Sequence, residues 1–339
     1  MKRHQVFLNT ATIALFAFLA AVAPGRAADT TPPPKSMGDG GIIHIPTNPT
    51  ATSAWHFAAI QKYDLDKKHN IAIQLLPSAT PTMTANLLQT GAAEVAIFSW
   101  VDLIRLRNSG VKVIGIAPFL RWGADHIIVP TDSTAKTIAD LKGKRFGILS
   151  RTNLDFILNM AVAKTRYHLD PEKDFVIQEG ATSLLRGLIE TGALDGSQMF
   201  NNITPLMVAG GKVRILYQMK ELVDSYGLPL TPELLYATSE DYAKAHPQNV
   251  RAFLATYREG VEVLRHEDAI WDDRGKTMEM PPEAISLLRD EMRLDIWTEF
   301  APTTTADIRK AFDFLVSQAG TEPFGFTSIP DGFITQEYD

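Results

Sequence analysis

Two arginines stand where they could bind an anion. Arg121 begins the segment Arg121-Trp122-Gly123, and Arg151 lies within Ser150-Arg151-Thr152-Asn153, beside the start of a predicted helix. A guanidinium group is planar and pairs with carboxylate, sulfonate or phosphate oxygens, and a helix N-terminus favours negative charge. We therefore expect Arg121 and Arg151 to hold an anionic ligand. The alternative for each is an arginine in a solvated loop.

Aromatic side chains gather in the same kind of segment. Three of the five tryptophans, Trp55, Trp100 and Trp122, fall at predicted strand ends or helix starts, and Phe98 and Phe200 accompany them. Each stacking or edge contact with a flat solute adds ~0.5–1.5 kcal/mol beyond area burial. We expect these rings to clamp a flat ligand. The alternative is that they fill the core of their own domain, above all Phe98, which ends a buried strand.

Neutral polar residues complete the candidate site. Ligands of open α/β sheets bind beyond the carboxyl ends of the strands, where helix N-termini present free N–H groups. We interpret Asp102 and Asp155, near the same ends, as acids of first helical turns rather than as ligands for an amine. The neutral residues that the rule selects are Thr47, Asn48, Thr80, Ser99, Thr152, Asn153, Asn201 and Asn202.

Catalytic and metal-binding motifs are absent from the sequence. It contains no nucleophile elbow, Walker loop, HExxH or GxGxxG pattern. It has no cysteine, and its eight histidines lack the spacing of metal ligands. We expect His56 and His126 to be hydrogen-bonding or packing residues. The sequence therefore predicts a protein that is not an enzyme, with no catalytic residue, no cofactor and no metal.

Predicted strands alternate with helices, which indicates parallel β-α-β units and an α/β fold. Three amphipathic helices near the C-terminus are expected to cover the first domain. The expected strands are 41–46, 71–76, 95–98, 111–117, 125–130, 145–149, 175–178, 197–200, 213–217 and 234–238. The expected helices are 54–68, 82–90, 101–108, 137–141, 152–168, 183–190, 205–208, 247–266, 282–291 and 305–318.

One stretch of the sequence occurs twice. Leu87–Trp100 and Leu188–Phe200 both carry Thr-Gly after an apolar helix end, then an acid and a short run that ends in an aromatic residue. Glycine in this position adopts the left-handed conformation that closes a helix. The offset is constant, since 191 − 90 = 101 and 192 − 91 = 101. Two copies are too few for a solenoid, so they indicate two similar lobes that face each other across a cleft.

The N-terminus has the features of a cleaved secretory signal over residues 1–27. A basic start precedes the apolar run 11–23 and the cleavage pattern Gly25-Arg26-Ala27. A membrane anchor is the alternative, but it would need ~20 apolar residues. Residues 28–41 form a Pro/Gly-rich tether. Without cysteine there is neither a disulfide nor a lipid-anchored N-terminus, so we expect a soluble periplasmic protein.

Size and charge exclude other classes. The 339 residues are 45% hydrophobic, enough for two α/β domains with good cores. The net charge of −6 is spread along the chain without a basic cluster, which argues against nucleic-acid binding.

An ordered set of motifs resembles a known family. It comprises Pro46-Thr47-Asn48-Pro49, the Leu87–Ala96 copy, Ile138–Gly147, Gly192-Ala193-Leu194-Asp195 and His246–Leu254. Together these segments resemble the periplasmic substrate-binding proteins of ABC importers, in the group that takes alkanesulfonates, taurine, nitrate and thiamine-precursor pyrimidines. The resemblance covers roughly residues 42–265.

The resemblance implies a type II periplasmic-binding-protein fold, in which two α/β lobes are joined by two crossing strands around a ligand cleft. Lobe one would comprise residues 42–124 and 230–339, and lobe two residues 125–229. The family often has a Gly-Ser/Thr pair where this chain reads Ser150-Arg151-Thr152-Asn153, which speaks against an inorganic anion or a simple sulfonate. The pyrimidine-synthesising relatives carry a cysteine-rich motif that this chain lacks.

The sequence therefore predicts a monomeric receptor that closes around a small organic solute and delivers it to an inner-membrane permease with a cytoplasmic ATPase. A planar or aromatic anion, such as an aryl sulfonate or carboxylate, is the first expectation, and a pyrimidine-like heterocycle the second. Two alternatives stay open: an enzyme of the same fold that acts on a small aromatic metabolite, and a periplasmic sensor that docks on a membrane signalling protein.

Overall fold

The structure is a computed structural model that describes residues 37–49, 51–78 and 80–339. The predicted signal peptide and most of the predicted tether lie outside the described residues. The end of the tether is bound to the folded chain, since the backbone N–H groups of Gly38 and Gly40 donate to the carbonyls of His69 and Asn70. None of the helices in the described part is long and apolar enough to span a membrane.

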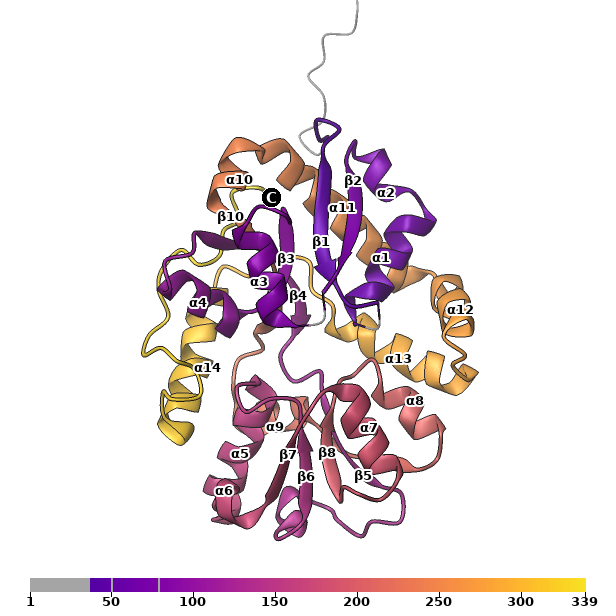
Figure 1. The fold of residues 1–339 in the computed structure, drawn as a ribbon, viewed down its shortest axis with the longest axis vertical. Helices are drawn as coiled ribbons and strands as arrows, with labels where there is room; N and C mark the ends of the chain where they lie inside the picture. The colour runs from indigo at the N-terminus through magenta and orange to yellow at the C-terminus, as the bar shows by residue number, and fades with distance from the viewer. Residues whose placement is uncertain (1–36, 50, 79) are drawn as a thin grey trace, which may run out of the picture. The chain divides into compact units, whose positions relative to one another are not determined.

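The strands of the described residues form three sheets (Figure 1). The first joins β1 (Ile42–Thr47) to β2 (Ala72–Pro77) in parallel. In the second, β10 (Pro232–Ser239) lies between β3 (Val95–Ser99) and β4 (Val113–Arg121). The third has the order β7 (Val176–Glu179), β6 (Arg145–Ile148), β8 (Gly196–Met199), β5 (His126–Pro130) and β9 (Val213–Gln218).

Strand direction differs from the prediction in two places. The expected parallel pairing holds for β1 with β2 and for β6 with β7 and β8. β5 and β10 instead run antiparallel to their neighbours. Each is the first strand after the chain leaves one group of elements for the other, so no helical crossover sets its direction.

The structure breaks the helix predicted over 54–68 and adds four that the sequence did not indicate: α6 (Pro171–Asp174), α9 (Met219–Ser225), α10 (Glu240–Ala245) and α12 (Asp268–Thr277). The break separates α1 (Ser53–Lys62) from α2 (Leu65–Lys68) at Asp64, whose φ of 49° is left-handed. The other helices are α3 (Pro81–Gln89), α4 (Trp100–Asn108), α5 (Leu154–Tyr167), α7 (Thr182–Glu190), α8 (Thr204–Ala209), α11 (Pro247–His266), α13 (Pro282–Asp295) and α14 (Thr304–Ala319), with a 3₁₀ turn at Ile138–Leu141.

The repeated Thr-Gly positions end helices, as predicted. Gly91 follows α3 with φ 71°, and Gly192 follows α7 with φ 75°. Both values lie in the left-handed region that glycine adopts without a Cβ clash. The two segments thus have the same local structure in two different sheets.

We keep the names lobe one for β1–β4, β10 and helices α1–α4 and α10–α14, and lobe two for β5–β9 and α5–α9. The exact partition stays a prediction. α11 packs on α1, as expected of a helix that covers lobe one, but α14 packs on α5 and α13 packs on α8. The last helices therefore contact both lobes rather than one.

Candidate functional site

The two chain crossings between the lobes are bonded to each other. β4 ends at Arg121 and β5 begins at His126, while the second crossing ends just before β10. The backbone N–H of Trp122 donates to the carbonyl of Thr231 at 2.8 Å. Arg121, Trp122, Asp125 and His126 are all buried. Polar groups in this region therefore lie in a low dielectric, where electrostatic interactions are strong.

Three carboxyl groups meet at the crossings, and we call Asp125, Asp155 and Glu233 the acidic cluster. Asp125 immediately precedes β5, Asp155 lies in the first turn of α5, and Glu233 lies in β10. Their exposed fractions are 4%, 0% and 8%. Asp155 interacts electrostatically with Asp125, and Glu233 interacts with both. The fold thus gathers three acids from separate parts of the chain into one buried region.

Burial raises the pKa of every member of the acidic cluster. It raises the pKa of Asp125 to about 7, although the His126 charge and the Gln198 amide act in the opposite direction. Burial also raises the pKa of Asp155 and that of Glu233 well above their usual range, and the neighbouring carboxyls raise both further. Loss of hydration and repulsion between like charges both favour the protonated carboxyl.

Several buried polar atoms around the acidic cluster complete no hydrogen bond with any described residue. These atoms are both carboxyl oxygens of Asp155, the indole Nε1 of Trp122, Oε1 of Gln198 and Oγ1 of Thr231. Most buried polar groups in folded proteins are paired. This concentration of unpaired donors and acceptors marks the crossing as a place where a bound solute could supply the missing partners.

Asn153, one of the predicted ligand residues, organises the N-terminus of α5. Its Oδ1 accepts from the backbone N–H groups of Asp155 and Phe156 at 2.9 and 3.1 Å. The same oxygen accepts from Nε2 of Gln198 at 2.7 Å. Gln198 Nε2 also lies 3.3 Å from Oδ2 of Asp125. Through Gln198, Asn153 therefore links the first turn of α5, which carries Asp155, to Asp125.

Strand-end loops of the two lobes are bonded to each other. Oγ1 of Thr52 donates to Oδ1 of Asn201 at 3.2 Å, and Nδ2 of Asn201 lies 3.4 Å from Sδ of Met292. Nε2 of Gln218 donates to Oε1 of Glu291 at 3.1 Å. These contacts bring a predicted site residue of lobe two, Asn201, against the loop that follows β1.

Both predicted anion-binding arginines have carboxylate partners. Nε of Arg121 donates to Oδ1 of Asp295, and both side chains are buried. Arg151 is exposed and lies 3.3 Å from Glu172 and 3.2 Å from Glu179. The described contacts of each guanidinium are therefore to protein carboxylates.

The predicted aromatic residues occupy different surroundings. Trp55 stacks on Trp271 with ring centroids 5.2 Å apart, and Phe98 and Trp100 belong to a hydrophobic core. Trp122 is fully buried at the crossing, whereas Phe200 is 39% exposed. Trp100 and Trp122 are the two whose indole N–H groups complete no hydrogen bond with a described residue, and that of Trp122 acts on Asp155.

Most of the remaining predicted residues make hydrogen bonds within their own loop or to the helix that follows it. Thr47 Oγ1 lies 3.0 Å from Ser53 Oγ, and Thr152 Oγ1 lies 2.9 Å from Ser150 Oγ. Thr80 and Ser99 cap α3 and α4 through their hydroxyls. Asn48 is exposed, while Asn202 is buried.

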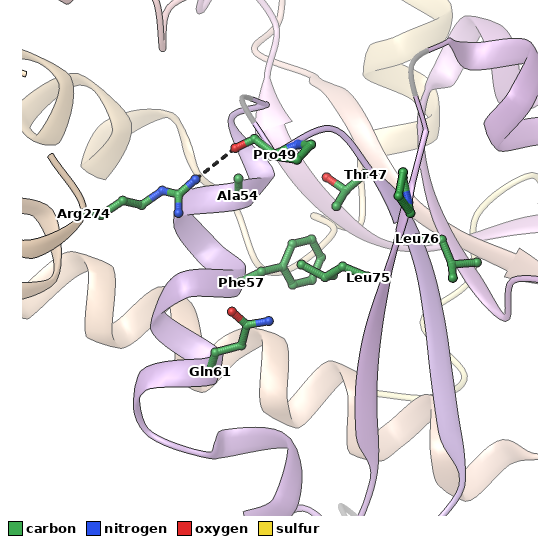
Figure 2. A pocket seen from close by; sticks show the side chains of 9 residues that line it. Thr47, Pro49, Ala54, Phe57, Gln61, Leu75, Leu76 and Arg274 are labelled. Carbon is green, nitrogen blue, oxygen red and sulfur yellow. Dashed lines mark hydrogen bonds between the residues drawn. The ribbon is translucent and has the colours of Figure 1, made fainter. Parts of the chain in front are cut away.

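A cavity of about 190 Å³ lies within lobe one, beside α1 and the ends of β1 and β2. Figure 2 shows Phe57 pointing from α1 towards β2 and Leu75 pointing from β2 towards α1, and Arg274 bonded to the carbonyl of Pro49, at 3.0 Å. The volume exceeds that of an apolar protein cavity known to bind benzene, about 150 Å³. Its lining residues are Thr47, Pro49, Ala54, Phe57, Gln61, Leu75, Leu76, Pro77 and Arg274.

His56 and His126, which we expected to pack or hydrogen-bond, are buried and have polar partners. Nε2 of His56 lies 3.0 Å from the carbonyl of Tyr257, and Nδ1 lies 3.1 Å from the hydroxyl of Tyr236. His126 lies 3.4 Å from Glu291. Across the part of the chain that the structure describes, no three histidine or acidic side chains are grouped as metal ligands.

Sequence reasoning missed Asp125 and Glu233 and read Asp155 as a first-turn acid. One signal could have found them. Glu233 interrupts the apolar strand Pro232-Glu233-Leu234-Leu235, and Asp155 stands in Leu154-Asp155-Phe156-Ile157-Leu158, where a solvated acid would be out of place.

Comparisons with known proteins agree with this architecture. The structure superposes on the alkanesulfonate-binding protein SsuA from Xanthomonas axonopodis pv. citri bound to MOPS, with a TM-score of 0.68, 16% identity and coverage of 82% of this chain and 93% of that one. For the aliphatic sulphonate binding protein SsuA from Escherichia coli the TM-score is 0.66, at 15% identity and 85% and 92% coverage. For the periplasmic nitrate-binding protein NrtA from Synechocystis PCC 6803 it is 0.59, at 11% identity and 86% and 84% coverage.

Sequence comparison places the chain in a family. No curated protein matches it. A family model described as NMT1/THI5 like matches residues 63–268, which is more than half of the chain. The chain therefore belongs to the NMT1/THI5-like family and has the type II periplasmic-binding-protein fold.

Proposed function

We propose that this protein is the solute-binding component of an ABC importer, and that it holds a small organic solute between its lobes. One observation carries the proposal: at the crossings of a fold shared with sulfonate- and nitrate-binding proteins, buried polar groups from both lobes lack partners. Asp155 and Gln198 come from lobe two, and Trp122 and Thr231 adjoin lobe one, at the end of β4 and the start of β10. A solute bound there would contact both lobes and complete their hydrogen bonds.

Hinge closure is the proposed mechanism. A solute that contacts both lobes stabilises the closed state by the contacts that the open state lacks, so binding shifts the population towards closure. The bond between Thr52 and Asn201 would form only when the lobes meet. A permease that recognises the closed form would then receive loaded protein.

The proposed site combines predicted and newly found residues. The predicted residues are Trp122, whose indole N–H acts on Asp155, and Asn153, which is bonded to Gln198. The newly found residues are Asp155 and Gln198, which have oxygens that complete no hydrogen bond with a described residue. Trp100, whose indole N–H completes none either, stays a candidate. Between the two expected ligand classes, the contacts favour a flat heterocycle over an anion, because Arg121 and Arg151 already face carboxylates. Asn201 and Asn202 would orient the solute from the start of α8, and the other predicted residues stay candidates.

Location and partners follow from the same proposal. The signal-like residues 1–27 would direct export, and the loaded monomer would dock on an inner-membrane permease with a cytoplasmic ATPase. The enzyme alternative predicts turnover of a small aromatic metabolite, and the sensor alternative predicts a signalling receptor as the docking partner.

Mass spectrometry of the solute that co-purifies with the mature protein tests the proposal. We expect a small flat organic compound that raises the melting temperature when added back and that is recovered chemically unchanged. Conversion of the compound by purified protein would favour the enzyme. Stimulation of a reconstituted permease and ATPase by the loaded protein would separate transport from sensing.

A further inference from the structure

We propose that the acidic cluster binds the positively charged, nitrogen-bearing end of the solute, an amine or amidinium group, and that binding displaces a proton. This inference rests on the proposed function and deepens it by naming the chemistry of the ligand. The ligand class is the opposite of the anion that the arginines alone suggested.

Once ionised, the carboxyl groups of the acidic cluster have no ion-pair partner among the described residues. Arg121 faces Asp295, and His126 faces Glu291 at 3.4 Å. Asp102, which also acts on Glu233, is bonded to Arg105 at 2.9 Å. No described cationic side chain forms an ion pair with a member of the acidic cluster. Arg121 acts on Asp155 and His126 acts on Asp125, each lowering the pKa, whereas Asp295 raises that of Asp125. A positively charged ligand would supply the missing counter-charge, as buried charges require.

Neither protonation state of Asp155 is satisfied by the protein alone. As a carboxylate it needs donors, and as a carboxylic acid it needs an acceptor for its proton. The indole N–H of Trp122 and the backbone N–H of Asp125 act on the carboxyl, but neither of its oxygens completes a hydrogen bond with a described group. The side chain is fully buried, so bulk water does not compensate it. An N–H-bearing ligand supplies the donors that an ionised Asp155 needs.

A second, independent set of open atoms lies beside the acids. The indole N–H of Trp122 acts on Asp155 without completing a hydrogen bond, and Oε1 of the buried Gln198 has no described partner while its Nε2 is bonded to Asn153. Oε1 of Gln198 is an acceptor, so it too calls for an N–H donor. Carboxyl groups and an amide with an open acceptor, buried in the same region, suit a group with several N–H donors.

An organic cation fits better than a metal ion. Among the described residues no three acidic or histidine groups have the arrangement of metal ligands. An amidinium presents two parallel N–H groups to one carboxylate, in the geometry that makes guanidinium–carboxylate pairs strong. Trp122 adds aromatic surface beside Asp155, which also attracts cations.

Proton release follows from the raised pKa values. Before binding, the cluster holds protons, since burial raises the pKa of Asp125 to about 7 and those of Asp155 and Glu233 well above their usual range. A bound cation favours the carboxylate, so a carboxyl proton passes to the solvent while the ligand keeps its own charge. By linkage, the affinity for a cation rises with pH wherever that proton is still bound to the free protein.

Three flat probes of similar size and different charge test the inference on the ligand-free mature protein: benzamidinium, benzamide and benzenesulfonate. We expect calorimetry to show at least tenfold tighter binding of benzamidinium than of the other two, with tighter binding at pH 8 than at pH 6. Titrations at pH 6 in two buffers of different ionisation enthalpy should reveal release of about one proton per ligand bound. Tighter binding of benzenesulfonate or benzamide, no binding of benzamidinium at millimolar concentration, or binding without proton release would overturn the inference.

The variant Asp155→Asn separates a ligand role from a structural one. Because neither carboxyl oxygen completes a hydrogen bond with a described group and burial disfavours the charge, we expect the variant to melt no lower than the wild type while its affinity for benzamidinium falls at least tenfold. Asp195→Asn, which removes a carboxylate bonded to Arg145 in lobe two, is the matched control and should keep the wild-type affinity. A lower melting temperature of Asp155→Asn with unchanged affinity would contradict the inference.

The identity of the co-purifying solute distinguishes the two proposals. An anionic solute would leave the importer function standing and overturn the cationic site. A solute that is converted by the protein would instead overturn the importer function.

Discussion

The guanidinium of Arg121 and the carboxylate of Asp295 form a buried ion pair that joins the end of β4 to the last residue of α13. The partners are 174 residues apart in sequence. Burial raises the pKa of Asp295, and the charge of Arg121 acts against that rise. The pair therefore keeps a charged arginine beside the crossing without leaving it free for an anionic solute.

Breaking this pair should destabilise the protein strongly. Asp295→Ala leaves the charge of Arg121 buried without its partner, which typically costs about 3–5 kcal/mol. We expect the free energy of unfolding, measured with urea, to fall by that amount. Arg151→Ala is the control, because its exposed pairs with Glu172 and Glu179 should contribute no more than about 1 kcal/mol. Equal losses in the two variants would contradict the argument.

Element order could be predicted from the sequence because local signals mark most boundaries. The helix over 247–266 was predicted to the residue, since Pro247 fits a first helical position. Asp64 has a left-handed backbone and separates α1 from α2, but no glycine or proline stands beside it, so the sequence does not predict the break. The helices α9 and α10 are too short to show a clear apolar period.

The site could be predicted only in outline, because burial and pairing are tertiary properties. Rules for strand ends pointed to Trp122 and Asn153, which the structure places at the crossing. They could not reveal that Arg121 would meet Asp295. Asp155 looks like any acid of a first helical turn until the fold shows that no solvent reaches it.

A close approach between α1 and α11 depends on Gly260. A Cβ there would lie 2.8 Å from Nε2 of His56 and 2.9 Å from Cγ1 of Ile60. Gly260→Ala should therefore lower the free energy of unfolding by about 1–3 kcal/mol through overpacking. Gly187→Ala, in the exposed middle of α7 with open space around its Cβ, should raise it by roughly 0.5–1 kcal/mol. Denaturant titration of both variants gives the comparison, and a stabilised Gly260→Ala would refute it.

His56 should make the protein sensitive to acid. Burial lowers its pKa from 6.5 to about 4. A carbonyl only accepts, so Nε2 must donate to Tyr257 and Nδ1 must accept from the hydroxyl of Tyr236. The folded state therefore favours the neutral ring, and the stability present above pH 6.5 is lost as pH falls towards 4.

The size of this effect can be measured against a variant that does not titrate. Between pH 7 and pH 4 the wild type should lose up to roughly 3 kcal/mol more than His56→Gln does, because each pKa unit corresponds to about 1.4 kcal/mol. His266→Gln changes an exposed histidine and should follow the wild type. Parallel curves for the wild type and His56→Gln would show that His56 does not drive the acid sensitivity.

The bond between Thr52 and Asn201 should stabilise the closed arrangement of the lobes even without a solute. Thr52→Val keeps the shape of the side chain and removes the donor to Asn201. A net hydrogen bond contributes about 0.5–1.5 kcal/mol, so the ratio of open to closed protein should rise roughly 2- to 12-fold.

The chain has no cysteine, so cysteines introduced at the exposed Lys67 and Lys173 accept spin labels without background. Their distance distribution should shift towards separated lobes in Thr52→Val, whereas Thr152→Val, which loses a bond only to Ser150 in its own loop, should match the wild type. An unchanged distribution in Thr52→Val would mean that other contacts, such as those of α13 with α8, hold the lobes together.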